Sequence, residues 1–202
     1  PDERSGDRVV FSLALAAKQS RELFVTVTCE SPGAPRGSVS FSEANAAATS
    51  ALERLKAGEC RVSTSHELFD EWLERSLSGL RMMITETPHG LFPYAGVPWY
   101  STPFGRDALI TALEVLWIQP ELARGVLRFL AATQAEVEDP AADAEPGKIV
   151  HELRRGEMAA LREIPFGRYY GSVDATPLFV MLADAYQAHT GDTETVAALW
   201  PH

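Results

Sequence analysis

The sequence predicts a mainly helical fold, in which antiparallel helical hairpins form part of an α/α barrel after a short β region. Apolar residues recur with helical spacing from Ser65 onward. Long segments without helical periodicity, 87–106 and 139–173, alternate with short turns between the helices. Hairpins joined in this way place all their long loops on one rim. A connector rich in proline and glycine at 31–38 separates the β region from the helices.

The β region and its linker come first. Residues 9–15 and 22–28 are rich in β-branched and aromatic side chains and partly alternate, which predicts two strands joined by a turn at 16–21. The alanine-rich, charged segment 42–56 predicts a helix with Ser42 as its N-cap, ended by Gly58. We therefore expect a β part at 1–38, a linker at 39–64 and a helical domain at 65–202.

The helical domain begins at Ser65, a predicted N-cap, with a helix over 65–80 that runs toward Ile84. Its apolar stripe is expected to pack on a core and consists of Leu68, Phe69, Trp72, Leu73, Leu77 and Leu80. Further helices are predicted at 107–118 and 121–136. The inward side chains of the second of these are Leu122, Val126, Leu127, Phe129 and Leu130. The next helix starts at Asp174 with Pro177 in its first turn and ends at Gly191, and another starts at Glu194.

Composition limits the function classes. The net charge of −10 without a basic cluster argues against nucleic acid. No apolar run reaches the roughly 18 residues of a membrane span, and no secretory signal opens the chain. Cys29 and Cys60 match no metal or redox spacing and indicate free thiols of a cytoplasmic protein. A first residue other than Met and a last segment that stops within a predicted helix favour a fragment of a longer protein.

The first candidate site group is Trp99, Tyr100, Arg106 and Asp107. Carboxylate and guanidinium groups hydrogen-bond to sugar hydroxyls, and aromatic rings stack on the apolar face of a pyranose. The position at a helix N-terminus also favours the charge of Asp107. The alternative is that Arg106 and Asp107 only cap the helix and pair with each other or with neighbours.

Two more groups lie on the predicted rim. His151, Glu152 and Arg154 stand within the second long loop, and the alternative for them is a solvated charged loop. The pair His151-Glu152 lacks the second histidine of a zinc-binding helix, so no metal site is expected. The third group is Tyr169, Tyr170 and Asp174, where Asp174 alternatively serves only as an acid in a helix's first turn.

These groups lie in three segments: AGVPWYSTPFGRD at 95–107, PGKIVHELRRGE at 146–157 and IPFGRYYGSVDATPL at 164–178. In this order they resemble the N-terminal part of the catalytic domain of bacterial amylo-alpha-1,6-glucosidases, the glycogen-debranching-enzyme-like family. The resemblance covers residues 90–192, about half of the chain. It implies a six-hairpin α/α-barrel glycosidase preceded by the end of a β-sandwich. It also implies inverting hydrolysis of α-glucosidic bonds without a cofactor.

The resemblance makes Arg106 and Asp107 binders of the terminal sugar and places the general acid and base beyond His202, so the fragment alone is expected to be inactive. Glycoside hydrolysis needs two carboxylates about 5–10 Å apart. Asp107, Glu152 and Asp174 are the candidates, and spacing alone does not choose between them.

We therefore expect a glycosidase that acts on an α-glucan or oligosaccharide. Asp107, Asp174 and Glu152 would hold the substrate, and the pocket walls would be Trp99, Tyr100, Tyr169 and Tyr170. The alternative is a non-catalytic α/α-barrel protein that binds carbohydrate, or a helical scaffold without a ligand. The linkage, the substrate length and the oligomeric state stay open.

Overall fold

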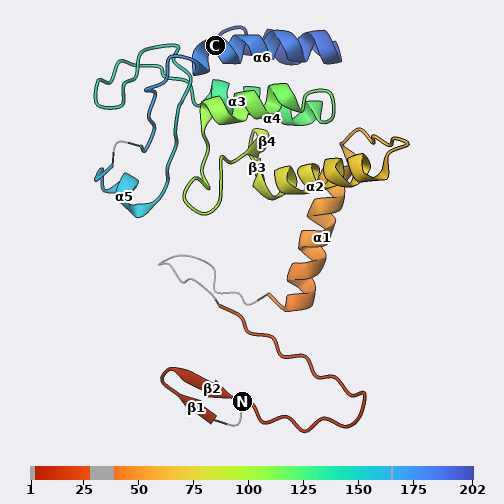
Figure 1. Cartoon of the computed structure of the whole chain (residues 1–202). Coiled ribbons are helices and arrows are strands. Elements are labelled where there is room, and N and C mark those ends of the chain that lie inside the picture. Colours follow the sequence, from red (N-terminus) through yellow and green to blue (C-terminus); the bar gives the residue numbers. More distant parts are fainter. Residues whose placement is uncertain (1–2, 28–38, 165) are drawn as a thin grey trace. The chain divides into compact units, whose positions relative to one another are not determined.

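The computed structural model describes residues 3–27, 39–164 and 166–202. Over these ranges the protein is mainly helical, with seven helices and two small antiparallel sheets (Figure 1). The helices do not close into a barrel over the same ranges. The chain forms two compact units, Pro1–Ala51 and Leu52–His202. The boundary falls inside helix α1, which the sequence assigns to the linker.

The N-terminal unit contains a short hairpin of strands β1 (Glu3–Ser5) and β2 (Arg8–Val10). The predicted strands at 9–15 and 22–28 are wrong over 11–27, which pairs with no strand. A strand needs a neighbour to bind its backbone groups, and no described segment fills that place, so Val25 and Val27 are 80% and 86% exposed. The predicted turn at 16–21 is confirmed by a Gln19 N–H bond to the Ala16 carbonyl oxygen (3.0 Å). Residue 28 and the connector 31–38 lie outside the described residues.

Helix α1 (Phe41–Ala57) confirms the predicted linker helix and ends before Gly58. Its cap is Ser40 rather than Ser42. The Glu43 N–H donates to Ser40 Oγ (3.3 Å), and the Ser40 N–H donates to the Glu43 carboxylate (3.0 Å). This reciprocal capping box satisfies two backbone donors at once, which explains why the chain enters the helix two residues earlier than predicted.

Helix α2 (Glu67–Met83) begins the C-terminal unit's helical region. Its N-cap is His66 rather than Ser65, because His66 Nδ1 accepts the Phe69 N–H (3.2 Å). The chain then enters a hairpin of strands β3 (Ile84–Thr87) and β4 (Gly90–Pro93). The predicted loop from residue 87 is therefore wrong at its start. The strands are only four residues long, too short for their alternation to show in the sequence.

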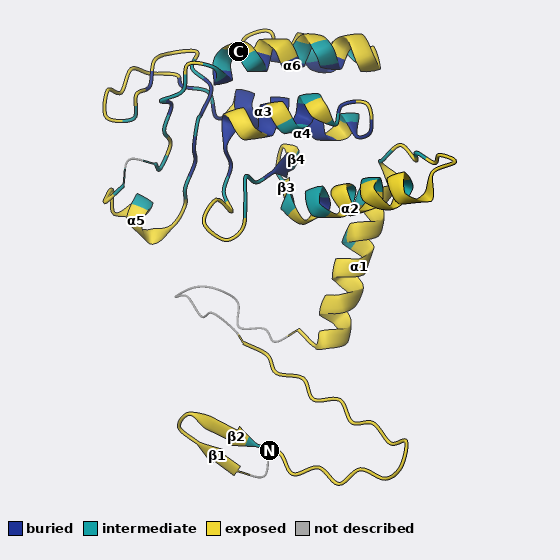
Figure 2. Ribbon diagram, in the orientation of Figure 1, coloured by how far each residue is buried: buried dark blue, intermediate teal, exposed yellow. Residues whose placement is uncertain are grey.

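The core is built around helix α4 (Pro120–Ala132), which contacts β4, α3 (Gly105–Glu114), α6 (Ala175–Thr190) and α7 (Thr193–Leu199). All five inward residues predicted for it are at most 4% exposed, as its dark blue colour shows (Figure 2). The predicted helix 107–118 is confirmed, but α3 ends earlier, at Glu114. Helix α6 ends at Gly191, whose φ of 71° closes it as predicted.

The apolar stripe of α2 differs from its prediction. Leu68, Phe69 and Trp72 are 70%, 44% and 61% exposed, because no element of the described chain covers them. The buried residue of this helix is Arg81, whose guanidinium pairs with Glu59 (2.5 Å) and Glu74 (2.8 Å). The ion pairs of Arg81 therefore hold the C-terminal part of α2, while the apolar residues of its N-terminal half are exposed to solvent.

Candidate functional site

The three segments singled out in the sequence meet in one irregular layer beside the N-terminal ends of α3 and α6 (Figure 1). The central segment, 149–154, is bonded on both sides through its backbone. The Gly105 N–H donates to the His151 carbonyl oxygen (2.9 Å), and the His151 N–H donates to the Tyr169 carbonyl oxygen (2.7 Å). The Tyr169 N–H in turn donates to the Glu152 carbonyl oxygen (3.0 Å). Backbone pairing therefore joins groups that are far apart in sequence.

Gly105 allows the start of α3 to contact the segment 149–154 directly. A Cβ at this position would lie 1.9 Å from the Val150 carbonyl oxygen, closer than two such atoms can come. Only glycine therefore fits at the start of α3. Phe104 occupies the N-cap position and makes no side-chain capping bond. The side chains that follow are thus positioned by the layer of loops and not by a local cap.

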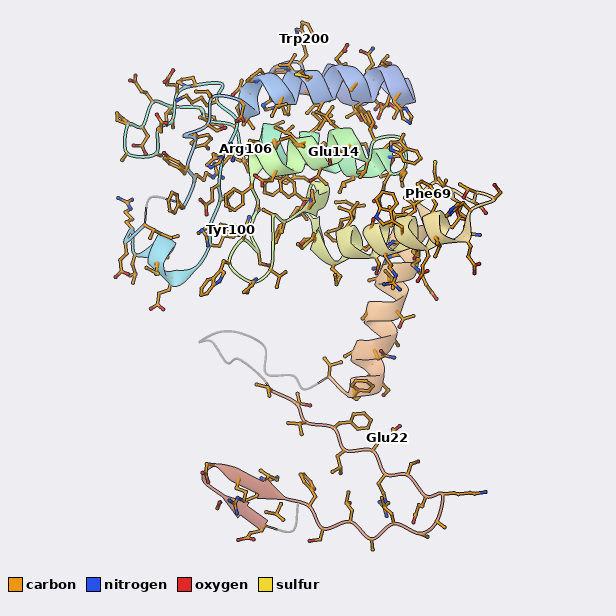
Figure 3. All side chains as sticks on the ribbon, viewed as in Figure 1. Glu22, Phe69, Tyr100, Arg106, Glu114 and Trp200 are labelled. Carbon is orange, nitrogen blue, oxygen red and sulfur yellow. The ribbon has the colours of Figure 1, made fainter. Side chains whose placement is uncertain are left out.

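Arg106 pairs with Asp174 and not with Asp107. The distance from Arg106 Nη1 to Asp174 Oδ2 is 3.6 Å, and both side chains are almost half exposed, at 47% and 42%. Arg106 projects from the start of α3, above the loop that carries Tyr100 (Figure 3). The pair joins the first turns of α3 and α6, so two of the predicted rim positions do converge.

Ser172, and not Asp174, accepts a backbone N–H at the start of α6, so the second oxygen of the Asp174 carboxylate can pair with Arg106. The Ser172 hydroxyl donates to Asp174 Oδ1, and its oxygen accepts the Ala175 N–H at the start of α6 (3.4 Å). Asp174 therefore does not cap the helix. The Ser172 hydrogen bond is the main cause that lowers the pKa of Asp174 below its ordinary value. Burial opposes this shift, and the Arg106 guanidinium adds a smaller lowering effect. The carboxylate is thus held ionised as a hydrogen-bond acceptor.

A cavity of about 800 Å³ opens beside the pair. Its polar lining comes from both helix starts and from the second long loop, and includes Arg106, Lys148, His151, Ser172, Asp174 and Thr176. Lys148 Nζ lies 3.1 Å from Glu145 and 3.5 Å from Asp143. The hydrogen bond to Glu145 is the main cause that raises the pKa of Lys148. The lining therefore includes both hydrogen-bond donors and acceptors. We call this hollow the Arg106–Asp174 cavity.

His151 belongs to the second candidate group and lines this cavity, although no substrate-holding role was predicted for it. Its Nδ1 is buried and has no hydrogen-bond partner among the described residues. Its ring meets the edges of Phe104 (5.7 Å between centroids) and Tyr169 (6.1 Å). The sequence signal available was a histidine between Val150 and Glu152 in a long loop. A buried ring nitrogen without a partner is a group that a ligand can satisfy.

Asp107 faces elsewhere. It lines a smaller hollow of about 270 Å³ together with Tyr94 and Ile110, and does not line the Arg106–Asp174 cavity. Arg106 lines both. Consecutive residues at the start of a helix point about 100° apart, so neighbours in sequence meet different surroundings. Asp107 and Asp174 therefore do not converge on one cavity.

Glu152 belongs to the framework of the layer. Its side chain is buried and pairs with Arg154, whose guanidinium also donates to the Trp99 carbonyl oxygen (3.2 Å). This pair ties the first long loop to the second. The alternative of a solvated charged loop is wrong for Glu152, since the residue is only 6% exposed.

The four predicted aromatic walls are split between surface and core, and none lines the Arg106–Asp174 cavity. Trp99 and Tyr100 are 79% and 57% exposed, and Tyr169 is half-buried between rings. Tyr170 is buried in the core, where its hydroxyl donates to the Thr133 carbonyl oxygen (2.8 Å) and burial raises its pKa. Tyr170 therefore packs in the core and does not line this cavity.

The described residues contain no group of three or more His, Cys, Asp or Glu side chains placed to hold a metal ion. Within the same ranges, none of the helices has the length and apolar character needed to cross a bilayer. No protein-family model matches the chain, and no curated protein is significantly similar to it.

Proposed function

We propose that the unit 52–202 binds carbohydrate in the Arg106–Asp174 cavity. The observation that carries the proposal is the half-exposed ion pair between the starts of α3 and α6. A guanidinium offers only donors and an ionised carboxylate only acceptors, whereas a sugar hydroxyl both donates and accepts. Adjacent hydroxyls of one sugar ring can therefore bind both members of the pair. The cavity volume of about 800 Å³ falls within the range typical of small-molecule sites.

We further propose that this binding serves a glycosidase of the glycogen-debranching type, built on an α/α barrel of which α3, α4, α6 and α7 form one part. The support for this step is the resemblance of the three segments and their meeting in one layer. Arg106 and Asp174 would hold the sugar while a general acid and a general base act at the glycosidic bond. In this proposal both catalytic groups are supplied from beyond His202.

The second candidate is carbohydrate binding without hydrolysis. One observation favours it: the Asp174 carboxylate already accepts a hydrogen bond from Ser172 and pairs with Arg106, which suits it to holding a ligand. Of the three carboxylates predicted from the sequence, Glu152 is engaged with Arg154 and Asp107 lines a separate hollow. The residues of this chain therefore support substrate holding more directly than bond cleavage.

Titration calorimetry with a malto-oligosaccharide and with a branched trisaccharide tests the binding step. Arg106→Gln and Asp174→Asn should each weaken binding by about 10–100-fold, since a hydrogen bond to a charged group contributes about 1.5–3 kcal/mol. Arg75→Gln is the matched control, because Arg75 forms an exposed ion pair on α2. Unchanged affinity in both site variants would refute the assignment of the cavity.

Glucose release from a branched limit dextrin separates the two candidates. The proposal expects release by a polypeptide that extends beyond His202 and its loss in the Arg106→Gln variant. Binding of the oligosaccharide without any release by such a polypeptide would instead establish a binding protein.

A further inference from the structure

A second cavity of about 410 Å³ lies between the end of α1, the turn of the β3–β4 hairpin and the first half of α4. It shares no lining residue with the Arg106–Asp174 cavity. One wall is fixed by Gly125 of α4, where a Cβ would lie 2.1 Å from the Leu91 carbonyl oxygen. Helix and hairpin are thus in backbone contact beside the cavity, which gives it a rigid wall.

Gln119 is a lining residue of this cavity and carries a side-chain oxygen without a hydrogen-bond partner among the described residues. The residue is 1% exposed, and this oxygen is its Oε1. Its backbone is satisfied, because its N–H donates to the Val115 carbonyl oxygen (2.8 Å) and its carbonyl oxygen accepts the Leu122 N–H (3.1 Å). The side chain stands at the N-cap position of α4 but makes no capping bond. A buried amide oxygen without a donor is rare and destabilising, and a ligand hydroxyl in the cavity can supply the donor.

Two arginines of the same helix line the cavity one turn apart. Arg124 pairs with Glu121, and Arg128 Nη2 donates to Thr195 Oγ1 (3.4 Å). Each guanidinium has five N–H donors, so these contacts leave donors available at both. The described charged lining consists of three arginines and two glutamates, which are Arg54, Arg124, Arg128, Glu86 and Glu121. Arg54 pairs with Glu86 (3.4 Å) and Arg124 pairs with Glu121, whereas Arg128 contacts a hydroxyl and no carboxylate of this lining.

We propose that this second cavity binds a phosphorylated sugar. A hydroxyl of the sugar would donate to Gln119 Oε1, and the phosphate oxygens would accept from Arg124 and Arg128. Arginine suits phosphate because its planar fork matches two oxygens at once. The position beside the first turns of α4 also favours an anion, through the helix dipole. The cavity volume falls within the range of small-molecule sites.

Titration calorimetry with glucose 6-phosphate, inorganic phosphate and glucose tests the proposal. The hexose phosphate should bind at least about tenfold more tightly than either part alone, because only it reaches both groups of contacts. Gln119→Leu should weaken the hexose phosphate by about tenfold and leave inorganic phosphate unchanged. Arg124→Gln and Arg128→Gln should weaken both phosphates.

Thermal unfolding of Gln119→Leu guards against a trivial loss of folding. This variant removes the unsatisfied oxygen and keeps most of the volume, so its Tm should equal or exceed that of the parent. Failure of all three probes to bind at millimolar concentration would overturn the proposal and leave a buried water as the partner of Gln119. Equal binding of phosphate and hexose phosphate would also overturn it, since the sugar would then make no contact.

The two cavities can be tested independently. Arg106→Gln should leave hexose phosphate binding unchanged, and Gln119→Leu should leave oligosaccharide binding unchanged. A loss of hexose phosphate binding in Arg106→Gln would contradict the assignment to the second cavity.

Discussion

Helices α2 and α4 both carry an apolar stripe, yet they have opposite fates. Eight residues of α4 are buried, among them Leu122, Leu127 and Leu130, whereas the buried residue of α2 is Arg81 (Figure 2). Helix α4 is enclosed by β4, α3, α6 and α7, and no described element covers the outer stripe of α2. An amphipathic pattern therefore tells which face of a helix can be buried. Whether that face is buried depends on segments distant in the sequence.

The largest expected effect concerns the anchoring of α2 by charge. Arg81→Ala removes the partner of Glu59, whose side chain is only 6% exposed, and should lower the free energy of unfolding by about 3–5 kcal/mol. Arg75→Ala on the same helix breaks an exposed pair with Glu71 and should change it by about 1 kcal/mol or less. Urea denaturation measures both. Similar values for the two variants would mean that α2 does not depend on its buried pair.

Truncation of one leucine on each helix sharpens the comparison next. Leu130→Ala in α4 should cost about 2–5 kcal/mol of unfolding free energy, because it leaves a cavity in a closed core. Leu68→Ala in α2 should cost about 0.5 kcal/mol or less, since that side chain is 70% exposed. A large cost for Leu68→Ala that grows with protein concentration would show that another copy of the chain covers α2 in solution.

A smaller effect is expected where α4 ends. The Tyr170 hydroxyl bonds the carbonyl of Thr133, the C-cap residue of α4. Tyr170→Phe should therefore cost about 0.5–1.5 kcal/mol in urea denaturation. The same variant should bind oligosaccharide as the parent does, because Tyr170 lies in the core. A specific loss of binding without loss of stability would restore this residue to the site.

The smallest effect is a pH dependence at the helix that packs on α4. Asp192 caps α7, and hydrogen bonds from Thr195, first from its side chain and then from its backbone, lower the pKa of Asp192 to about 2 from 3.8. Because the folded-state pKa is depressed, the stabilisation is complete above the ordinary pKa and is lost as the pH falls toward 2. In Asp192→Asn, the midpoint of urea denaturation should depend less on pH over this interval than in the parent. The control is Glu67→Gln, an exposed residue in the first turn of α2, which should leave the dependence of the urea midpoint on pH as in the parent.

The sequence predicted local features well. Apolar spacing identified the five inward residues of α4, and Gly191 marked the end of α6. Sequence-based prediction failed where strand formation or helix burial depends on a neighbouring segment. Residues 11–27 have strand composition but no strand beside them, and the stripe of α2 has no described cover. The strands β3 and β4 were missed because four residues are too few for a periodicity to appear.

The candidate site shows the same limit. The sequence placed Arg106 and Asp174 on one rim, and they form an ion pair. It could not distinguish Asp107 from Asp174, because the direction of a side chain at a helix start depends on the helix orientation. It gave Tyr169 and Tyr170 the same role, although one is half-buried and the other lies in the core.

Because residue 105 is a glycine, the start of α3 and the second long loop are in direct backbone contact and should move together. Since the first turn of α3 touches the backbone at Val150, neither segment can shift without displacing the other. A molecule that grips Arg106 would also immobilise His151, although 45 positions separate them along the polypeptide. A ligand in the Arg106–Asp174 cavity should therefore slow amide exchange throughout the second long loop, or make this loop more resistant to proteases.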